Sequence, residues 1–249
     1  MMNGQIYSGT SGLVLPMPKR DFPPEYASFS RLAYYSTLFN SIEINSSFYK
    51  LPTVKTVKRW AEETQNEFRF TFKLWQEITH NKNLGFDKEN VAEFFRVIDM
   101  IGVKKGSLLI QFPPGISYAY YRKVKDLLEV VRRNDRKNDW HISIEFRHLS
   151  WYREETYELL SKANMSMVYH DYHSAPSTWP KPWNETVYLR LHGPEEGYRG
   201  SYDESSLLEY ATYINQWSMD GRSIFIYFNN TLGGALSNLI ELNKLILSK

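Results

Sequence analysis

Short apolar runs recur along the chain, and each is followed by a polar or Gly/Pro turn and then by a stretch with helical spacing. The runs are rich in Ile, Val, Phe and Tyr, which favours buried strands. The strands that this pattern predicts are Gln5–Ser8, Ser41–Ile44, Phe68–Leu74, Ser107–Phe112, His141–Phe146, Ser166–His170, Thr186–Leu191 and Ser223–Phe228. Between them we expect helices such as Val54–Glu63 and Lys88–Ile101, and an apolar stripe from Leu236 to Ile246 predicts a last helix.

Eight strands that alternate with helices in 249 residues are typical of a (β/α)8 TIM-like barrel, and we predict that residues 1–249 form one such domain. A doubly wound open sheet is the alternative, but it usually has fewer strands, and no Gly-rich phosphate loop follows the first strand. One unit departs from the repeat. After the sixth strand the chain carries Pro176, Pro180 and Pro182, so we expect a Pro/Trp-rich loop in place of the sixth helix.

Polar and charged side chains collect at the carboxyl ends of the predicted strands, where the active sites of barrel enzymes lie. Alternation places Glu145 with Arg147 on one face of the fifth strand, and Arg190 with His192 on one face of the seventh. We therefore expect these side chains to point into the mouth of the barrel. The direction of Asp171 stays open, because it shares its parity with apolar residues of the sixth strand.

Two interpretations of these charges remain. Charged groups in a partly dry cavity are costly unless they are paired, which favours a functional reason for them. The structural alternative is that Glu43, Lys73, Glu145 and Arg147 form interior ion pairs in a barrel with too few aliphatic layers.

Composition narrows the classes of function. The chain has 30 Lys and Arg against 28 Asp and Glu, and a net charge of +2 argues against the dominating basic face of a non-specific nucleic-acid binder. The absence of Cys excludes disulfides, thiolate metal sites and a Cys nucleophile. Neither a signal peptide nor a membrane-spanning stretch is visible, so we expect a cytoplasmic protein with no membrane partner.

No catalytic motif of high specificity is present: there is no GxSxG, HExxH or Walker sequence. The turn Gly9-Thr10-Ser11-Gly12 carries two hydroxyls, and we interpret it as a tight turn, with an anion-binding backbone as the alternative. The aromatic residues Trp179, Trp183, Tyr198 and Tyr202 are suited equally to anchoring a loop and to stacking on a base or sugar ring.

Several short stretches together resemble the YecE-like family, domain of unknown function 72, over essentially the whole chain. They are Gly9–Gly12, Glu43–Tyr49, Phe70–Lys73, Thr79-His80, Gln111–Pro114, Glu145–Trp151, Asp171, Tyr188–Gly193 and Tyr227–Asn230. The family is similar in fold to TIM barrels and has no established activity, so the resemblance implies a barrel and a site but no reaction. The chain departs from the family pattern at Leu13, where Trp is frequent, and at Phe112, where Leu is frequent.

We therefore predict an enzyme, a hydrolase or isomerase, that binds a small anionic substrate bearing phosphate or carboxylate at the barrel mouth. The predicted catalytic residues are Glu43, Glu145, Asp171 and His192: the glutamates would divide acid and base work through separated pKa values, and Asp171 with His192 would relay a proton. The predicted substrate-binding residues are Thr10, Asn45, Tyr49, Lys73, Gln111, Arg147, His148, Trp151, Arg190 and Asn229, of which Lys73, Arg147 and Arg190 would hold the anion.

Two alternatives belong to other classes. A divalent metal on Glu43, Glu145, Asp171 and His192 would make the protein a metal-dependent hydrolase, isomerase or endonuclease-like barrel. The cations in the same mouth argue against that cofactor, and we assign no metal ligand. A non-catalytic protein that binds nucleic acid or another ligand through the aromatic loop is the second alternative. The oligomeric state stays open.

Overall fold

The computed structural model describes residues 3–177, 182 and 184–247. Within them the strands are β1 (Ile6–Thr10), β2 (Ser41–Ile44), β3 (Arg69–Lys73), β4 (Lys105–Gln111), β5 (His141–Glu145), β6 (Ser166–His170), β7 (Thr186–Leu191) and β8 (Ser223–Phe228). The α-helices are α1 (Arg31–Leu38), α2 (Ser46–Tyr49), α3 (Val54–Glu63), α4 (Gln76–Thr79), α5 (Lys88–Ile98), α6 (Tyr121–Asn134), α7 (Glu154–Lys162), α8 (Glu204–Met219) and α9 (Ala235–Leu247). The predicted helix Lys88–Ile101 ends early, at Ile98, and continues as the 3-10 turn Asp99–Lys104.

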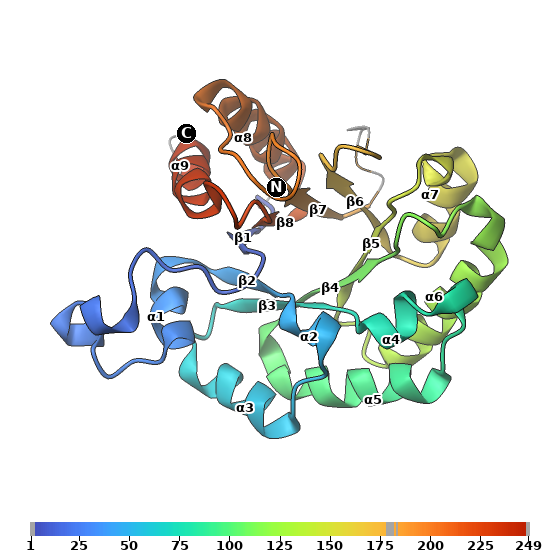
Figure 1. The fold of residues 1–249 in the computed structure, drawn as a ribbon, viewed down its shortest axis with the longest axis horizontal. Coiled ribbons are helices and arrows are strands. Elements are labelled where there is room, and N and C mark those ends of the chain that lie inside the picture. The colour runs from blue at the N-terminus through green and yellow to red at the C-terminus, as the bar shows by residue number, and fades with distance from the viewer. Residues whose placement is uncertain (1–2, 178–181, 183, 248–249) are drawn as a thin grey trace.

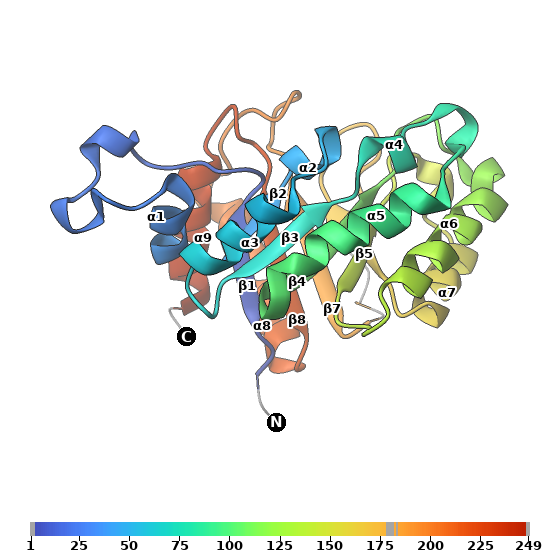
Figure 2. The same cartoon turned by 90° about the horizontal axis from the view of Figure 1, so that it is seen from below.

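The strands form one parallel sheet in the order β1-β8-β7-β6-β5-β4-β3-β2, and helices cover its outer surface (Figures 1 and 2). The two ends of this order meet at a seam, where a bridge joins Ser11 to Glu43 and the N–H of Gly12 donates to the carbonyl of Glu43 at 2.8 Å. A Cβ on Gly9 would lie 2.1 Å from the carbonyl oxygen of Ser41, so the seam requires glycine there. The predicted (β/α)8 TIM-like barrel is confirmed.

The sixth repeat is irregular, as predicted. The described residues between β6 and β7, which are 171–177, 182, 184 and 185, contain no helix. The loop after β7 continues past Tyr198 and Tyr202 before α8 begins at Glu204. Residues 171–177 and the loop after β7 directly follow the carboxyl ends of their strands, so they border the mouth of the barrel.

Apolar residues on the outward faces of the strands pack against the helices and make the main core. The inside of the barrel holds a smaller cluster of Leu109, Val168, Tyr188, Phe225 and Tyr227. Hydroxyls complete this inner layer, because Ser41, Thr71, Ser107 and Ser143 also lie fully buried on the strands. The charged side chains of the mouth lie above this layer. No helix in the described ranges combines the length and the apolar composition needed to cross a bilayer.

The hydroxyl of Tyr227 connects β8 to the other side of the seam, where it lies 2.6 Å from Ser41 Oγ and 2.7 Å from Thr71 Oγ1. We expect Tyr227→Phe to lower the free energy of unfolding by about 1–2 kcal/mol, because the ring stays packed while two buried hydroxyls lose a partner. Urea denaturation measures the change. Tyr49→Phe is the control, since that side chain is 69% exposed and should change stability by less than about 0.5 kcal/mol. Equal effects for the two variants would contradict the inner hydroxyl layer.

Candidate functional site at the barrel mouth

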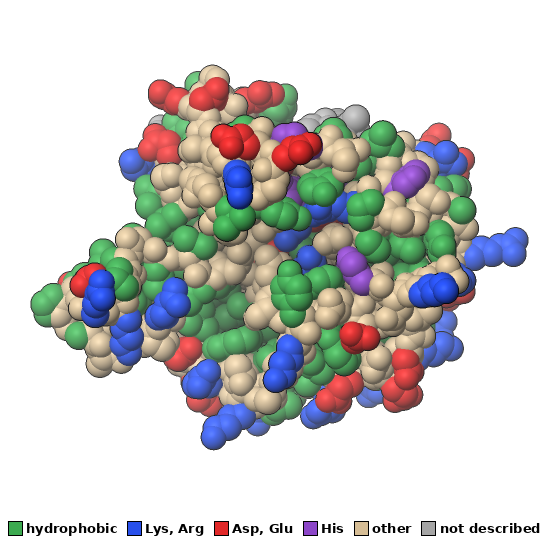
Figure 3. Space-filling model, in the orientation of Figure 1, with side chains coloured by type: hydrophobic (Ala, Val, Ile, Leu, Met, Phe, Trp, Pro, Cys, Tyr) green, Lys and Arg blue, Asp and Glu red, His purple; other side chains and the backbone are tan. Residues whose placement is uncertain are grey.

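The carboxyl ends of the strands face the viewer in Figures 1 and 3. In the space-filling view, Lys and Arg side chains lie at the bottom of a hollow in the middle of this face, with apolar side chains around its rim (Figure 3). The register of β2 and β3 places the charged side chains at two depths in this hollow. Glu43 pairs with Thr71, and Lys73 is the next inward-facing position along β3, so Lys73 lies above Glu43 toward solvent.

Glu43 and Arg190 form the floor of the mouth. Nη2 of Arg190 lies 3.0 Å from Oε1 of Glu43, and its Nε lies 3.1 Å from Oε2. Glu43 also accepts hydrogen bonds from Ser11 Oγ at 2.7 Å and from the Tyr188 hydroxyl at 2.5 Å. Both charged side chains are buried, with Glu43 at 0% and Arg190 at 2% exposure. This pair therefore joins β2 to β7 across the seam side of the barrel.

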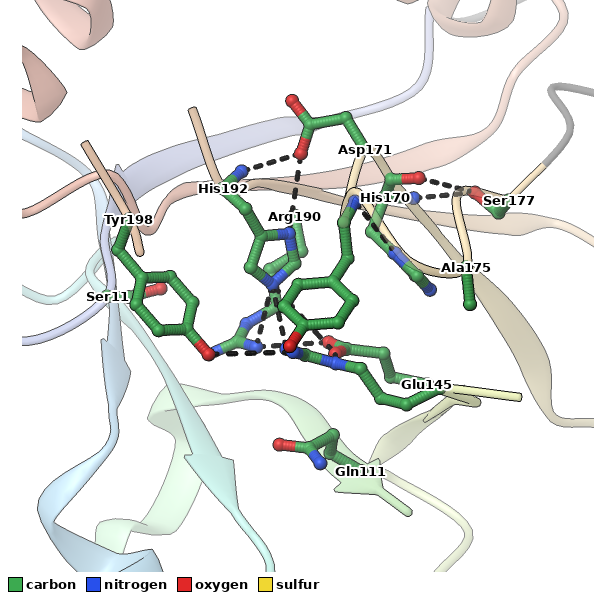
Figure 4. A network of polar contacts seen from close by, with 12 residues as sticks. Ser11, Gln111, Glu145, His170, Asp171, Ala175, Ser177, Arg190, His192 and Tyr198 are labelled. Carbon is green, nitrogen blue, oxygen red and sulfur yellow. Dashed lines mark hydrogen bonds and ion pairs between the residues drawn. The ribbon is translucent and has the colours of Figure 1, made fainter. Parts of the chain in front are cut away.

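Glu145 lies between two guanidinium groups (Figure 4). Arg147 Nε donates to its Oε1 at 2.5 Å, and Arg190 Nη1 donates to its Oε2 at 3.1 Å. Arg190 consequently bridges both glutamates, and Nη2 reaches Asn45 Oδ1 only at 3.5 Å. Two carboxylates and two guanidiniums thus balance one another.

Neighbouring charges decide the ionisation of both glutamates. Burial opposes ionisation, but Arg190 and the hydroxyls of Tyr188 and Ser11 hold the pKa of Glu43 below its usual 4.5. Despite its burial, Glu145 has a pKa well below the usual range because Arg147 and Arg190 flank it. Both pKa values are thus lowered, and neither is raised as a general acid at neutral pH would require. Both carboxylates are ionised at neutral pH, and the geometry makes them counter-ions.

Arg147 and Arg190 also fix the tautomer of His192. Their Nη2 and Nη1 atoms lie 3.0 and 3.3 Å from its Nε2. A guanidinium can only donate, so Nε2 accepts and the proton resides on Nδ1, which lies 3.4 Å from Asp171 Oδ1. Asp171 further accepts from the backbone N–H of His192 at 2.7 Å and from the Tyr202 hydroxyl. Asp171 thus turns toward His192 and orients it, and burial lowers the pKa of the imidazole.

Lys73 differs from the two arginines. Its side chain is 8% exposed, and its Nζ lies over the ring of Phe48, 4.1 Å from the centroid. Among the described residues the ammonium has no hydrogen bond and no ion pair. Burial and the nearby Arg190 and Arg147 outweigh Glu145 and Glu43, and the pKa of Lys73 falls to about 7. A substantial fraction of this amine is therefore unprotonated at neutral pH.

Four other predicted substrate contacts lie at or near the mouth without joining the network. Asn45 borders Arg190, and Tyr49 is exposed at the end of α2, the helix that follows Asn45. Gln111 stands apart in Figure 4 and donates to the carbonyl of Phe112 at 3.2 Å. Asn229 is buried at the end of β8, where its backbone N–H donates to Leu191.

Three predicted contacts have structural roles instead. Trp151 is fully buried in the core and stacks on Phe146 at a centroid distance of 4.2 Å. The hydroxyl of Thr10 donates to the carbonyl of Gly12 inside its own turn. His148 Nδ1 accepts the backbone N–H of Ser150 and caps a 3-10 turn. Their occurrence in the family-like stretches reflects local folding rather than exposure to the mouth.

Several residues that shape the site are absent from the predicted catalytic and substrate-binding residues. Tyr188 shares the inward parity of Arg190, a signal that was available. The ring of Tyr172 lies 3.7 Å from the Arg147 guanidinium carbon, and the Tyr198 hydroxyl lies 3.5 Å from its Nη1. Both come from loops, where alternation gives no direction. Trp179 and Trp183, considered for stacking, lie outside the described residues.

The described residues of the mouth do not form a set of metal ligands. In the part of the chain that the structure describes, no three His, Asp or Glu side chains gather as a metal site would require. Arg190 lies between Glu43 and Glu145, and Arg147 lies between Glu145 and His192. The carboxylates are thus already neutralised by guanidinium groups.

We expect Glu145→Gln to lower the free energy of unfolding by about 3–5 kcal/mol, because Arg147 and Arg190 would stay buried beside a neutral amide. Chemical denaturation measures the loss. Glu129→Gln is the matched control: Glu129 pairs with Arg133 at 3.1 Å on the surface of α6, and its loss should cost about 1 kcal/mol at most. A Glu145→Gln variant as stable as this control would contradict the central role of the buried network.

We expect Lys73→Met to stabilise the protein most strongly below pH 7. With a pKa near 7 in place of 10.5, the folded protein binds fewer protons than the unfolded chain between these values. Stability of the wild type therefore rises with pH across this window, while the cost of the buried ammonium, about 1.4 kcal/mol per pKa unit, is fully present below it. Urea denaturation from about pH 6 to 10 should show the advantage of Lys73→Met shrinking. A difference independent of pH would contradict a lowered pKa.

Comparison with known proteins identifies the family. A family model described as Protein of unknown function DUF72 matches residues 7–247. The UPF0759 protein YunF of Bacillus subtilis (strain 168) is 26% identical over 248 residues, covering 86% of this chain and 85% of that protein. A crystal structure of a DUF72 family protein (EF0366) from Enterococcus faecalis V583 matches with a TM-score of 0.77 at 19% identity and covers 99% of both chains.

A more distant likeness concerns the fold alone. The crystal structure of an AP endonuclease, family 2, from Brucella melitensis matches with a TM-score of 0.58 at 9% identity, covering 97% of this chain and 98% of that one. A shared barrel carries no shared chemistry by itself. The family match over almost the whole length is decisive, and this chain belongs to the DUF72 family.

Proposed function

We propose that this protein is an enzyme that acts on a small anionic substrate at the barrel mouth, with Arg147 as the anion contact and Lys73 as the reactive amine. One observation carries the proposal: the two arginines have carboxylate partners, whereas Lys73 has none among the described residues. A buried amine without a carboxylate partner is destabilising. Perturbed groups of this kind cluster at functional sites, which supports a role for Lys73 in chemistry.

Arg147 is better suited than Arg190 to contact a substrate. Every nitrogen of Arg190 faces Glu43, Glu145, His192 or Asn45. Arg147 uses Nε for Glu145 and Nη2 for His192, whereas its Nη1, among the described residues, has only the Tyr198 hydroxyl at 3.5 Å. A guanidinium edge matches the oxygens of a carboxylate or phosphate. Arg147 is therefore the residue that we assign to anion binding. Arg190 holds the ion-paired floor of the mouth together.

Lys73 supplies the chemistry in this proposal. An amine with a pKa near 7 is available at neutral pH both as a base and as a nucleophile. Glu43 and Glu145 are fixed counter-ions that hold the cations in place before a substrate arrives. Such preorganised charge needs little rearrangement during a reaction.

We expect inorganic phosphate or citrate to raise the melting temperature at constant ionic strength. A ligand at about 100 times its Kd stabilises the folded state by about 2.7 kcal/mol, which corresponds to a shift of several degrees for a chain of this size. Arg147→Lys should reduce the shift, since it keeps a cation beside Glu145 but removes the guanidinium edge. Differential scanning calorimetry measures both.

Arg133→Lys is the matched control, because Arg133 is an exposed residue of α6 paired with Glu129. It should keep the full response to the anions. A flat response of the wild type, or the same response in Arg147→Lys, would overturn the proposed anion contact. Stabilisation by a single-stranded oligonucleotide without any response to small anions would favour the nucleic-acid-binding alternative.

A further inference from the structure

The backbone of Lys73 is fixed at the end of β3, and its amine lies against an aromatic ring. The backbone carbonyl of Lys73 accepts a hydrogen bond from Ser47 Oγ at 2.8 Å, and the next residue, Leu74, donates to the carbonyl of Leu109 at 2.8 Å. The side chain then crosses the face of the buried Phe48 ring. Two backbone hydrogen bonds and one aromatic ring thus present Nζ at the end of β3, above the ion-paired floor. Such positioning is needed by a group that forms a bond with substrate.

We infer that Lys73 forms an imine with a small aldehyde or ketone that carries a carboxylate or phosphate. This inference rests on the proposed function and names its substrate class. The anionic group would contact Arg147, and the carbonyl carbon would lie at Nζ of Lys73. Among the described cations of the mouth, Lys73 is the one with a nucleophilic nitrogen, because a guanidinium stays protonated.

The charges around Lys73 suit both stages of imine formation. Arg190 and Arg147 favour the free amine that attacks the carbonyl. Glu145 and Glu43 oppose them and would stabilise the positive charge of a protonated imine. The ring of His80 makes an edge contact with Phe48 at a centroid distance of 4.8 Å. Burial and the nearby Lys73 lower its pKa to about 4, so it adds no positive charge at pH 7.

The reaction balances without any further reagent. The lone pair of Nζ attacks the carbonyl carbon, a C–N bond forms, and the π electron pair moves to oxygen, which gains a proton while nitrogen loses one. The hydroxyl group of the carbinolamine then takes up a proton and leaves as water while the nitrogen lone pair forms the C=N bond of a protonated imine. The imine nitrogen releases its remaining proton, which replaces the one consumed. Amine and carbonyl give imine and water, with no oxidation or reduction.

Reductive trapping tests the inference on the intact chain. The protein is incubated with glyoxylate or pyruvate and sodium cyanoborohydride, and adducts are mapped by peptide mass spectrometry. We expect one adduct per chain on Lys73, formed at least tenfold faster than on any exposed lysine. Its rate should reach half of its maximum near pH 7, whereas a free lysine side chain in a reference peptide, with a pKa of about 10.4, keeps gaining reactivity at higher pH.

Variants separate this inference from the proposed function. Lys73→Met should lose the selective adduct, while Lys125→Met, which changes an exposed residue of α6, should retain it. Uniform labelling of all lysines, or selective labelling that survives in Lys73→Met, would overturn the imine. If trapping fails while phosphate still raises the melting temperature and Arg147→Lys reduces that rise, the imine is wrong and the proposed function stands. If both fail, both are overturned.

Discussion

Arg190 allows two carboxylates to lie inside the barrel without contact with water. Glu43 and Glu145 come from strands on different sides of the barrel, and each has 0% exposure. An isolated buried carboxylate would take up a proton or destabilise the fold. The single guanidinium of Arg190 contacts both, so β2, β5 and β7 depend on one shared partner. Arg147, His192 and Lys73 are the neighbours of this bridge.

The bridge produces an uneven distribution of charge. Arg147 completes the pairing of Glu145, and both arginines occupy the Nε2 lone pair of His192. This leaves the amine of Lys73 beside two cations whose carboxylates are already engaged. The structural and the functional interpretations of the mouth charges are therefore compatible: the glutamates and arginines form the interior ion pairs, and burial together with the two arginines lowers the pKa of the lysine above them.

The parts of the site that follow from alternation could be predicted from sequence. The inward direction of Glu145 and Arg190 depends only on strand parity, and both lie in the network. Residues on turns were less predictable, because long-range packing sets their direction. Trp151 belongs to the same stretch as Arg147, yet its side chain lies in the core, where it stacks on Phe146. Asp171 faces His192 because the loop after β7 brings Tyr202 against it, a contact across 31 positions.

The protonation states of the site depend on distances between atoms, which neither strand parity nor composition provides. A list of acidic and basic residues suggests that two glutamates divide acid and base work, whereas distances show that each has a guanidinium within hydrogen-bond range. The same distances assign the proton of His192 to Nδ1, since neither arginine can accept one. With both glutamates ionised and Nε2 occupied, the proposed function assigns proton exchange near pH 7 to Lys73, whose pKa is lowered to about 7. The chemistry of this mouth therefore depends on which cation the network leaves without a partner, a property of pairing geometry that composition does not contain.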